Sequence, residues 1–160
     1  MMKVHRGFTL VELLIVIGLL TILATVVVPN FASFQNQKSL DNAAFQLKGY
    51  FQSTQQKSIS QDGGSQWGIY LATVAGGRDF YKIFYGASYL SGTVTDSVYL
   101  PPKIKFINPA QGFSKEIIFS KLIGIPSAPA TTSLAISGSP SVCKTIVINA
   151  AGLISSVLCP

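Results

Sequence analysis

Charged side chains are scarce in this sequence. Only 11% of its 160 residues are charged, against roughly 25% in an average soluble domain. The 12 Lys and Arg outnumber the 6 Asp and Glu, which gives a formal net charge of +6. A mean hydropathy of +0.44 is too apolar for a disordered basic tail. Global disorder is therefore excluded, and the length predicts one domain with its own core.

Histidine is rarer still, which bears on catalysis. The only histidine is His5, and a chain without its N-terminal segment would have none, which excludes Ser-His-Asp catalysis, Cys-His catalysis and His-ligated metals. The acids after Glu12 are scattered, without a close pair or metal-ligand spacing: Asp41, Asp62, Asp79, Asp96 and Glu116. Ser141 and Lys144 form an S-x-x-K, but they open a predicted strand instead of sharing a helical turn. We expect no enzyme, no metal site and no cofactor.

The apolar residues concentrate in residues 8–28, which read FTLVELLIVIGLLTILATVVV and carry Glu12 as their only charge. As a helix this segment spans about 30 Å, the thickness of the hydrocarbon core of a bilayer. The preceding MMKVHRG contains Lys3 and Arg6 and no acid, so the positive-inside rule keeps this end cytoplasmic. The sequence therefore predicts a single-pass membrane helix with an extracytoplasmic head.

Glu12 distinguishes this segment from other export signals. A secretory signal needs a small-x-small cleavage site, and the nearest candidate begins with Asn30. A lipoprotein signal needs a cysteine just after the apolar run, whereas the first one is Cys143. A plain signal anchor explains everything except Glu12, because a carboxylate inside a spanning helix costs at least about 2.5 kcal/mol.

Residues Gly7 to Glu12 read GFTLVE, after a short basic leader and before an apolar helix. This arrangement resembles the class III signal of type IV pilins and type II secretion pseudopilins. The resemblance implies that a prepilin peptidase cuts after Gly7 and methylates Phe8, and that Pro29 matches a helix-kinking proline. It also implies residence in a bacterial inner membrane, contact with lipid before assembly, an inner-membrane assembly platform, and other pilin or pseudopilin subunits as partners in a pilus or pseudopilus.

A physical role for Glu12 follows from such processing. Removal of the leader leaves an amine on Phe8, and an axial step between stacked subunits would set that amine beside Glu12 of a neighbour. Opposite charges attract strongly at low dielectric, whereas a lone carboxylate in hydrocarbon is costly. Phe8, Glu12 and Pro29 are therefore the candidate assembly residues. The alternative is that Glu12 reaches the membrane edge and has no assembly role.

The helix is predicted to continue beyond the membrane. Residues 38–60 contain no proline, and apolar residues recur at helical spacing at Leu40, Ala44, Leu47 and Phe51. A bend or local unwinding is expected at Pro29, and residues 62–64, Asp-Gly-Gly, are expected to end the helix. The predicted divisions are a leader at 1–7, a membrane helix at 8–28, an amphipathic helix at 29–62 and a β-rich head at 63–160.

Short β-rich runs follow, so the predicted class is α+β: the long helix of the pilin fold packed on an antiparallel sheet. The strands are expected at 67–74, 80–85, 93–100, 103–107, 116–121, 134–137, 145–149 and 153–158, with a hairpin turn at 75–79 and an irregular loop at 125–132. The WGIYL run, the EIIF run and the closing strand-Gly-strand unit are similar to the GspH/FimT type of minor pilin or pseudopilin. An ordinary major pilin is the alternative.

The last two runs predict a disulfide. If Asn149 faces Leu153 across a three-residue loop, the antiparallel register places Cys143 opposite Cys159. Opposed residues of this kind have the Cα spacing that a disulfide requires, and an exported chain provides the oxidising compartment. A bulge at Gly152 would shift the register by one residue and separate the two thiols.

Four lysines suggest a second function. Lys103, Lys105, Lys115 and Lys121 lie close in sequence around one acid, and the first two are expected on one face of a strand. Such a patch is a candidate for binding DNA phosphates, as in a DNA-uptake pilus. A solubilising surface is favoured instead, because no aromatic residues interleave with the lysines. The remaining alternative is a single-pass anchored domain with no filament.

Overall fold

The computed structural model describes residues 8–159, without the side chains of residues 26–30 and 32. The predicted leader, residues 1–7, lies outside the described residues. The chain divides into two compact units, Met1–Gln35 and Asn36–Pro160.

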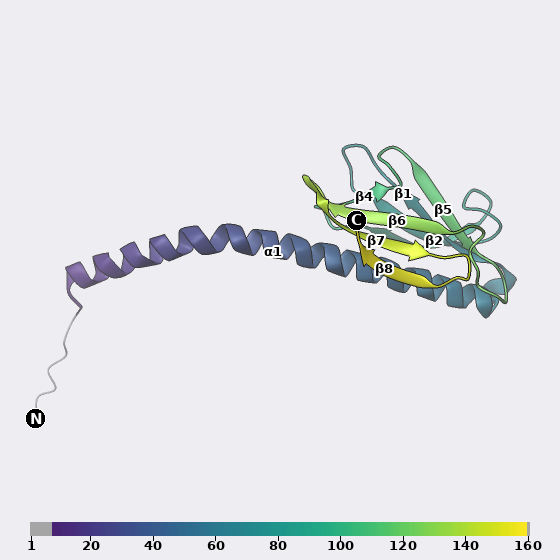
Figure 1. The fold of residues 1–160 in the computed structure, drawn as a ribbon, viewed down its shortest axis with the longest axis horizontal. Coiled ribbons are helices and arrows are strands. Elements are labelled where there is room, and N and C mark those ends of the chain that lie inside the picture. The colour runs from purple at the N-terminus through teal and green to yellow at the C-terminus, as the bar shows by residue number, and fades with distance from the viewer. Residues whose placement is uncertain (1–7, 160) are drawn as a thin grey trace, which may run out of the picture. The chain divides into compact units, whose positions relative to one another are not determined.

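One helix, α1 (Leu10–Ile59), extends from the first unit into the second (Figure 1). Helix is assigned through residue 29, so the local unwinding expected at Pro29 is not found. α1 ends at Ile59, before the predicted end at residue 62, and Gln61 is the first residue after it with a positive φ, 55°. A 3-10 turn, η1 (Asp62–Gly64), follows, with Gly63 at a φ of 65°.

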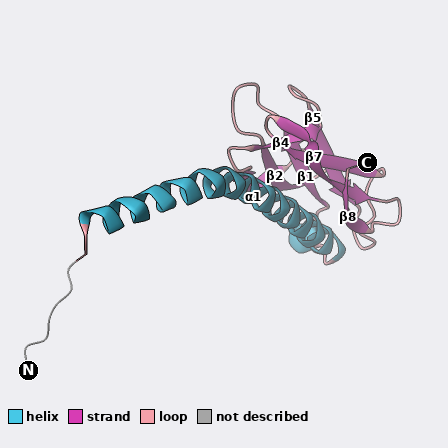
Figure 2. Ribbon diagram, turned by 60° about the vertical axis from the view of Figure 1, so that its left-hand side comes forward, coloured by secondary structure: helices cyan, strands magenta, loops and turns pink. Residues whose placement is uncertain are grey.

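Two antiparallel sheets of four strands each make up the rest of the second unit as described (Figure 2). One sheet has the order β3-β2-β1-β5 and the other β4-β6-β7-β8. The strands are β1 (Trp67–Ala72), β2 (Phe80–Tyr85), β3 (Thr93–Tyr99), β4 (Ile104–Asn108), β5 (Ser114–Phe119), β6 (Ala130–Ile136), β7 (Ser139–Ile148) and β8 (Ile154–Leu158). The predicted α+β class, a long helix followed by an antiparallel head, is confirmed.

A single core joins α1 to both sheets. The helix contributes the predicted stripe of Leu40, Ala44, Leu47 and Phe51, all buried. Alternate residues of the strands face this stripe: β1, β2 and β5 contribute from one sheet, and β4, β6, β7 and β8 from the other. The helical spacing in the sequence was therefore a correct guide to the buried face of α1.

The end of α1 is fixed to two loops through Gln55. Its side-chain amide donates to the carbonyls of Gly124 and Gly152, each at 2.8 Å. Both glycines have positive φ, and a Cβ on Gly124 would lie 2.6 Å from Ile59, while one on Gly152 would lie 2.7 Å from Gln55. Only glycine satisfies both the backbone conformation and this close approach.

Two strand predictions need correction. Residues 125–132 were expected to form a loop, but β6 begins at Ala130, because the Ala-Thr-Thr run pairs with residues 146–148 of β7. β7 begins at Ser139, well before residue 145, and its early residues pair with β6 after an irregularity between Ala135 and Ile136. Both segments are rich in Ser and Pro, and the partner strand overrides their weak strand propensity.

The C-terminal hairpin has the predicted register. Val147 faces Ser155 and Thr145 faces Val157 in the β7–β8 ladder. Gly152 has a φ of 81°, and Asn149 donates its N–H to the carbonyl of Leu153 at 3.1 Å. Cys143 and Cys159 form the predicted disulfide, with their Cα atoms 5.6 Å apart.

Removal of this disulfide gives a test of its contribution. The double variant Cys143→Ser/Cys159→Ser is expected to lose about 3 kcal/mol of unfolding free energy, the loop-closure value for a sequence separation of 16. Urea unfolding followed through Trp67, the one tryptophan, measures this loss. A reducing agent should lower the wild-type midpoint to the same value and leave the variant unchanged. Equal midpoints for wild type and variant would contradict the prediction.

Candidate functional site: the N-terminal segment of α1

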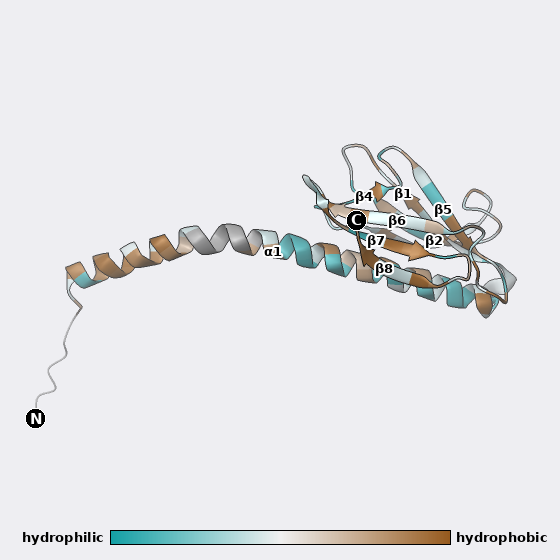
Figure 3. Cartoon of the chain, viewed as in Figure 1, coloured by the Kyte–Doolittle hydropathy of each residue, from teal (hydrophilic) through white to brown (hydrophobic). Residues whose placement is uncertain are grey.

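The first unit exposes apolar side chains on all sides of α1. Phe8 and the large apolar residues from Leu10 to Leu23 have between 45% and 78% of their surface exposed. Residues 13–17 are all among them, and five successive residues cover more than one full turn. Brown, the colour of apolar residues, predominates in this segment (Figure 3). A helix that is apolar all round requires an apolar environment outside itself.

None of the helices in the described part of the chain meets the length and hydropathy that crossing a membrane requires, although residues 8–28 were expected to cross.

The hydroxyl groups in this segment are bonded within the helix. Thr21 Oγ1 donates to the carbonyls of Ile17 at 2.7 Å and Gly18 at 2.9 Å, and Thr25 Oγ1 donates to Ile22 at 2.7 Å. A hydroxyl that is bonded to the preceding turn needs no water. These two threonines therefore do not oppose burial of the segment in an apolar environment.

Thr9 caps the start of α1. Its Oγ1 accepts a hydrogen bond from the backbone N–H of Glu12 at 3.2 Å, and its carbonyl accepts one from Leu13 at 3.2 Å. Thr-x-x-Glu is the spacing of a capping box, and an acid in the first turn is stabilised by the helix dipole. Glu12 thus has a local role that the sequence analysis missed, although its spacing from Thr9 was visible there.

The predicted assembly residues are only partly described. Gly7, the expected cleavage residue, lies outside the described residues, and Pro29 is described by its backbone alone. Phe8 has 77% of its surface exposed, and Glu12 is also exposed. Their expected pairing is between two subunits, so it remains a prediction.

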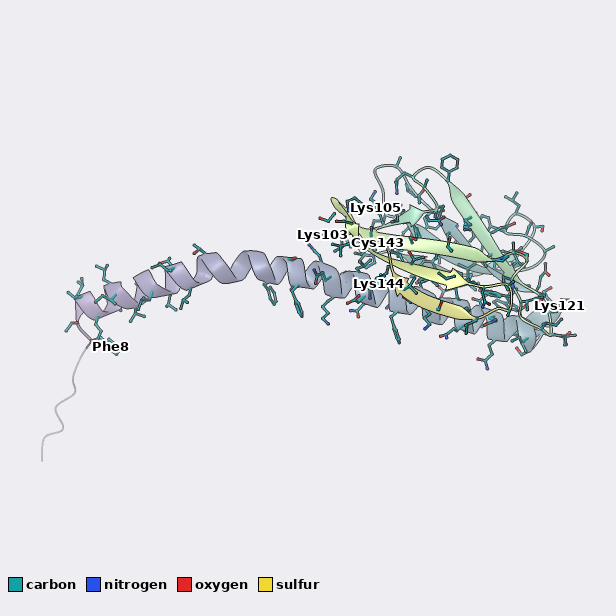
Figure 4. The ribbon with its side chains drawn as sticks, in the orientation of Figure 1. Phe8, Lys103, Lys105, Lys121, Cys143 and Lys144 are labelled. Atoms are coloured by element: carbon teal, nitrogen blue, oxygen red, sulfur yellow. A yellow bond between two sulfur atoms is a disulfide. The ribbon has the colours of Figure 1, made fainter. Side chains whose placement is uncertain are left out.

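The four candidate lysines do not form one surface. Figure 4 places Lys103 and Lys105 near Cys143 and Lys121 at the opposite end of the sheets. Lys121 Nζ donates to the carbonyl of Gly64, and Lys115 Nζ donates to that of Thr131 at 2.8 Å. Lys103 precedes β4 instead of lying in it. Burial lowers the pKa of Lys115, which weakens its case as a phosphate ligand.

The residues weighed for catalysis have other uses. Ser141 and Lys144 lie three positions apart in β7, so they face opposite sides of the sheet. Lys144 Nζ pairs with Asp41 at 3.1 Å. No group of three His, Cys, Asp or Glu side chains capable of holding a metal occurs within residues 8–159.

Asp79 is the buried acid of the second unit. Its Oδ1 accepts the N–H of Val74 at 2.9 Å, and its Oδ2 accepts the N–H of Phe106 at 2.8 Å and the amide of Gln111 at 3.4 Å. The carboxylate therefore ties the β1–β2 turn to β4 of the other sheet, with no surface exposed. All of these hydrogen-bond donors belong to the same chain as Asp79, so the carboxylate stabilises the fold.

Tyr50 and Tyr81 join α1 to the first sheet. Their rings meet edge to face at 5.4 Å, and Tyr50 Oη donates to Asp96 of β3 at 3.4 Å. Burial and the nearby carboxylate raise the pKa of Tyr50. Burial raises the pKa of Tyr81 further, and the charges of Tyr50 and Asp96 add to the effect. Both phenols stay protonated and act as packing groups.

Comparison with known proteins identifies the N-terminal segment. Residues 2–28 match the family described as the prokaryotic N-terminal methylation motif. A stretch of 55 residues is 44% identical to the type IV major pilin protein PilA of Myxococcus xanthus strain DK1622, over 34% of this chain and 24% of PilA. The match thus spans about a quarter of that relative's length.

The type IV minor pilin FimU of Pseudomonas aeruginosa strain PAO1 is a similar solved structure. It resembles 76% of this chain over 93% of its own length, with 17% identity and a TM-score of 0.49. The matches to the methylation motif and to PilA confirm the resemblance to type IV pilins first seen in residues 7–12.

Proposed function

We propose that this chain is a structural subunit, a minor pilin or pseudopilin, of a type IV pilus or type II secretion pseudopilus. The observation that carries the proposal is the segment from Phe8 to Leu23. It joins a methylation motif to a helix that exposes apolar side chains on all sides. Such a helix needs lipid before assembly and neighbouring helices afterwards.

In this proposal residues 1–7 are a leader that a prepilin peptidase removes after Gly7, and Phe8 is then methylated. Residues 8–28 hold the chain in the inner membrane, with the head outside, until an assembly platform transfers it to the filament. The helix continues to Ile59, and residues 63–160 form the head, which contributes surface contacts and no catalysis. Similar subunits are the partners, and the apolar surface of the helix supports this choice.

Mass spectrometry of the mature N-terminus tests the proposal. A peptide that begins with N-methylated Phe8 is expected from cells that contain the peptidase, and an uncut chain from cells that lack it. An intact Met1 in both strains would instead indicate a plain membrane anchor. The ratio of this chain to the most abundant subunit in sheared filaments then separates a minor subunit from a major one, since a minor subunit is present in a small fraction.

A further inference from the structure

The outer face of the first sheet carries a cluster of rings and cations. Ile69 and Leu71 of β1 are buried in the core, so Tyr70 between them points to the opposite face of the sheet. The ladder then brings further residues to that side, and Tyr89 reaches it from the β2–β3 loop. We call this surface the aromatic face: Tyr70, Arg78, Phe80, Lys82, Tyr89 and Tyr99.

The ladder arranges this face in rows. Tyr70 pairs with Lys82 on one side and with Glu116 on the other, and Lys82 pairs with Ser97. A row of four strands spans about 14 Å at the usual strand spacing of about 4.8 Å. Tyr89 stacks on Tyr70 at 3.8 Å, so a ligand that follows this row reaches Lys82 and Ser97 but not the ring face of Tyr70 that Tyr89 covers.

The rings form two groups. We call Phe80 and Tyr99 the shelf, and Tyr70 and Tyr89 the wall. Phe80 and Tyr99 lie 5.7 Å apart at 56° in the neighbouring row, and Tyr99 has 57% of its surface exposed. Tyr70 and Tyr89 stack in parallel at 3.8 Å, and Tyr89 also meets the buried Phe84 at 5.9 Å. Tyr89 is thus held in place beside the half-buried Phe80 and the exposed Tyr99.

A cation lies between the shelf and the wall. Lys82 Nζ is 5.3 Å from the centre of the Phe80 ring and 5.7 Å from that of Tyr89, and it donates to Tyr89 Oη at 3.1 Å. An ammonium group has three donors, so two remain for a ligand. Contact with ring faces holds the charge in place without neutralising it.

A second cation borders the shelf. Arg78 donates from Nε and Nη2 to the carbonyl of Leu100 at 2.9 and 2.7 Å, and its guanidinium carbon lies 5.8 Å from the centre of the Tyr99 ring. These two bonds use two of its five donors. The aromatic face therefore holds two positioned cations, each beside a ring.

The charges favour a sparsely charged anion. The two cations are accompanied by Glu116, whose Oε2 accepts the N–H of Tyr89 at 2.9 Å. A nucleic acid strand carries a phosphate on every nucleotide and binds by neutralising several of them, which one excess positive charge does not accomplish. A carboxylated sugar presents an apolar C–H face for a ring, hydroxyls for Ser97 and Glu116, and one carboxylate for Lys82.

We propose that the aromatic face binds an acidic polysaccharide, with a pyranose ring against Phe80 and Tyr99 and its carboxylate on Lys82. The carboxylate accepts the free donors of Lys82, and charge-assisted bonds of this kind are stronger than neutral ones. The proposal goes beyond the structural role and does not depend on it, because a single chain carries the whole surface.

Calorimetric titration of the full chain in a zwitterionic detergent, free of sugar groups, tests this proposal. The probe is aldotetraouronic acid, a tetrasaccharide that carries a single uronic acid, and saturable binding is expected. Lys82→Gln should weaken it at least about tenfold, the loss of one charge-assisted contact, and Tyr99→Ala should weaken it by a similar factor. Neutral maltotetraose should bind more weakly to wild type and lose nothing further in Lys82→Gln, because it has no carboxylate.

Two control variants test whether any loss of binding is specific to the aromatic face. Lys121→Gln removes a cation that is not part of the aromatic face and that bonds to the carbonyl of Gly64, and Phe45→Ala removes an exposed ring of α1, so both should bind like wild type. Tyr99→Leu replaces Tyr99→Ala if the latter lowers the urea midpoint. No binding of aldotetraouronic acid, or equal losses in the controls, would overturn the proposal. Tighter, Lys82-dependent binding of a twelve-nucleotide oligo(dT) would overturn it in favour of a nucleic acid ligand.

Discussion

Replacing Glu12 with alanine is expected to lower incorporation of this chain into filaments at least about a hundredfold, while insertion and processing continue. The physical reason is the amine of Phe8 on a neighbouring subunit, which loses its counter-charge in an apolar interior. Breaking a buried ion pair costs about 3–5 kcal/mol, and each 1.4 kcal/mol is a factor of about ten. The measurement is the amount of chain in sheared filaments relative to the amount in membranes.

The Thr9 cap makes a stricter version of this experiment possible. Glu12 also occupies the acidic position of the Thr-x-x-Glu spacing, and its backbone N–H bonds to Thr9, so an alanine variant keeps that bond but removes the side chain that the spacing and the helix dipole favour. Glu12→Gln keeps the capping geometry and removes only the charge. If the ion pair controls assembly, Glu12→Gln should fail as Glu12→Ala does.

Thr9→Val is the matched control. It removes the hydroxyl acceptor and keeps the carboxylate, so it should cost about 1 kcal/mol of helix stability and leave most incorporation intact. Normal incorporation of Glu12→Gln, with loss in Thr9→Val, would contradict the ion pair and assign Glu12 to the cap alone.

Replacing Asp79 with alanine is expected to lower the unfolding free energy by about 4 kcal/mol. The substitution removes the acceptor for the N–H groups of Val74 and Phe106, and buried donors without a partner cost about 1–3 kcal/mol each. Trp67 lies in β1, at 5% exposure, and its fluorescence in urea reports the midpoint. The second unit should loosen where the β1–β2 turn meets β4.

Two further variants serve as comparisons for Asp79→Ala. Asp79→Asn retains one carbonyl acceptor, so about half of the loss is expected. Asp62→Ala removes an exposed acid whose side chain is not part of this network, and it should change stability by less than about 0.5 kcal/mol. A loss below about 1 kcal/mol for Asp79→Ala would mean that water reaches the freed N–H groups.

Features fixed by local spacing were predictable from the sequence. The stripe from Leu40 to Phe51 needed only helical periodicity, and the pairing of Cys143 with Cys159 needed only the loop around Gly152 and the antiparallel register. The start of β6 at Ala130 was missed, because a distant partner strand stabilises a run with weak propensity of its own.

Features that depend on several distant segments were not predictable. Asp79 accepts bonds from the β1–β2 turn and from β4, and the aromatic face collects Tyr70, Lys82 and Tyr99 from three strands. Neither arrangement has a sequence pattern, since the pairing of strands decides which rings meet. The separation of Lys103 from Lys121 has the same origin, because closeness in sequence says little once strands reverse direction.

The junction of Gln55 with Gly124 and Gly152 has a consequence for tracing the ancestry of the head. A side chain at either glycine would collide with α1, and the two carbonyls need a donor with the reach of Gln55. These three positions are restricted by steric clash and hydrogen bonding, so their residues should be retained after most other positions have diverged. Distant relatives should therefore keep a glutamine near the end of the long helix, together with two widely spaced glycines, and this trio would identify them where overall identity no longer does.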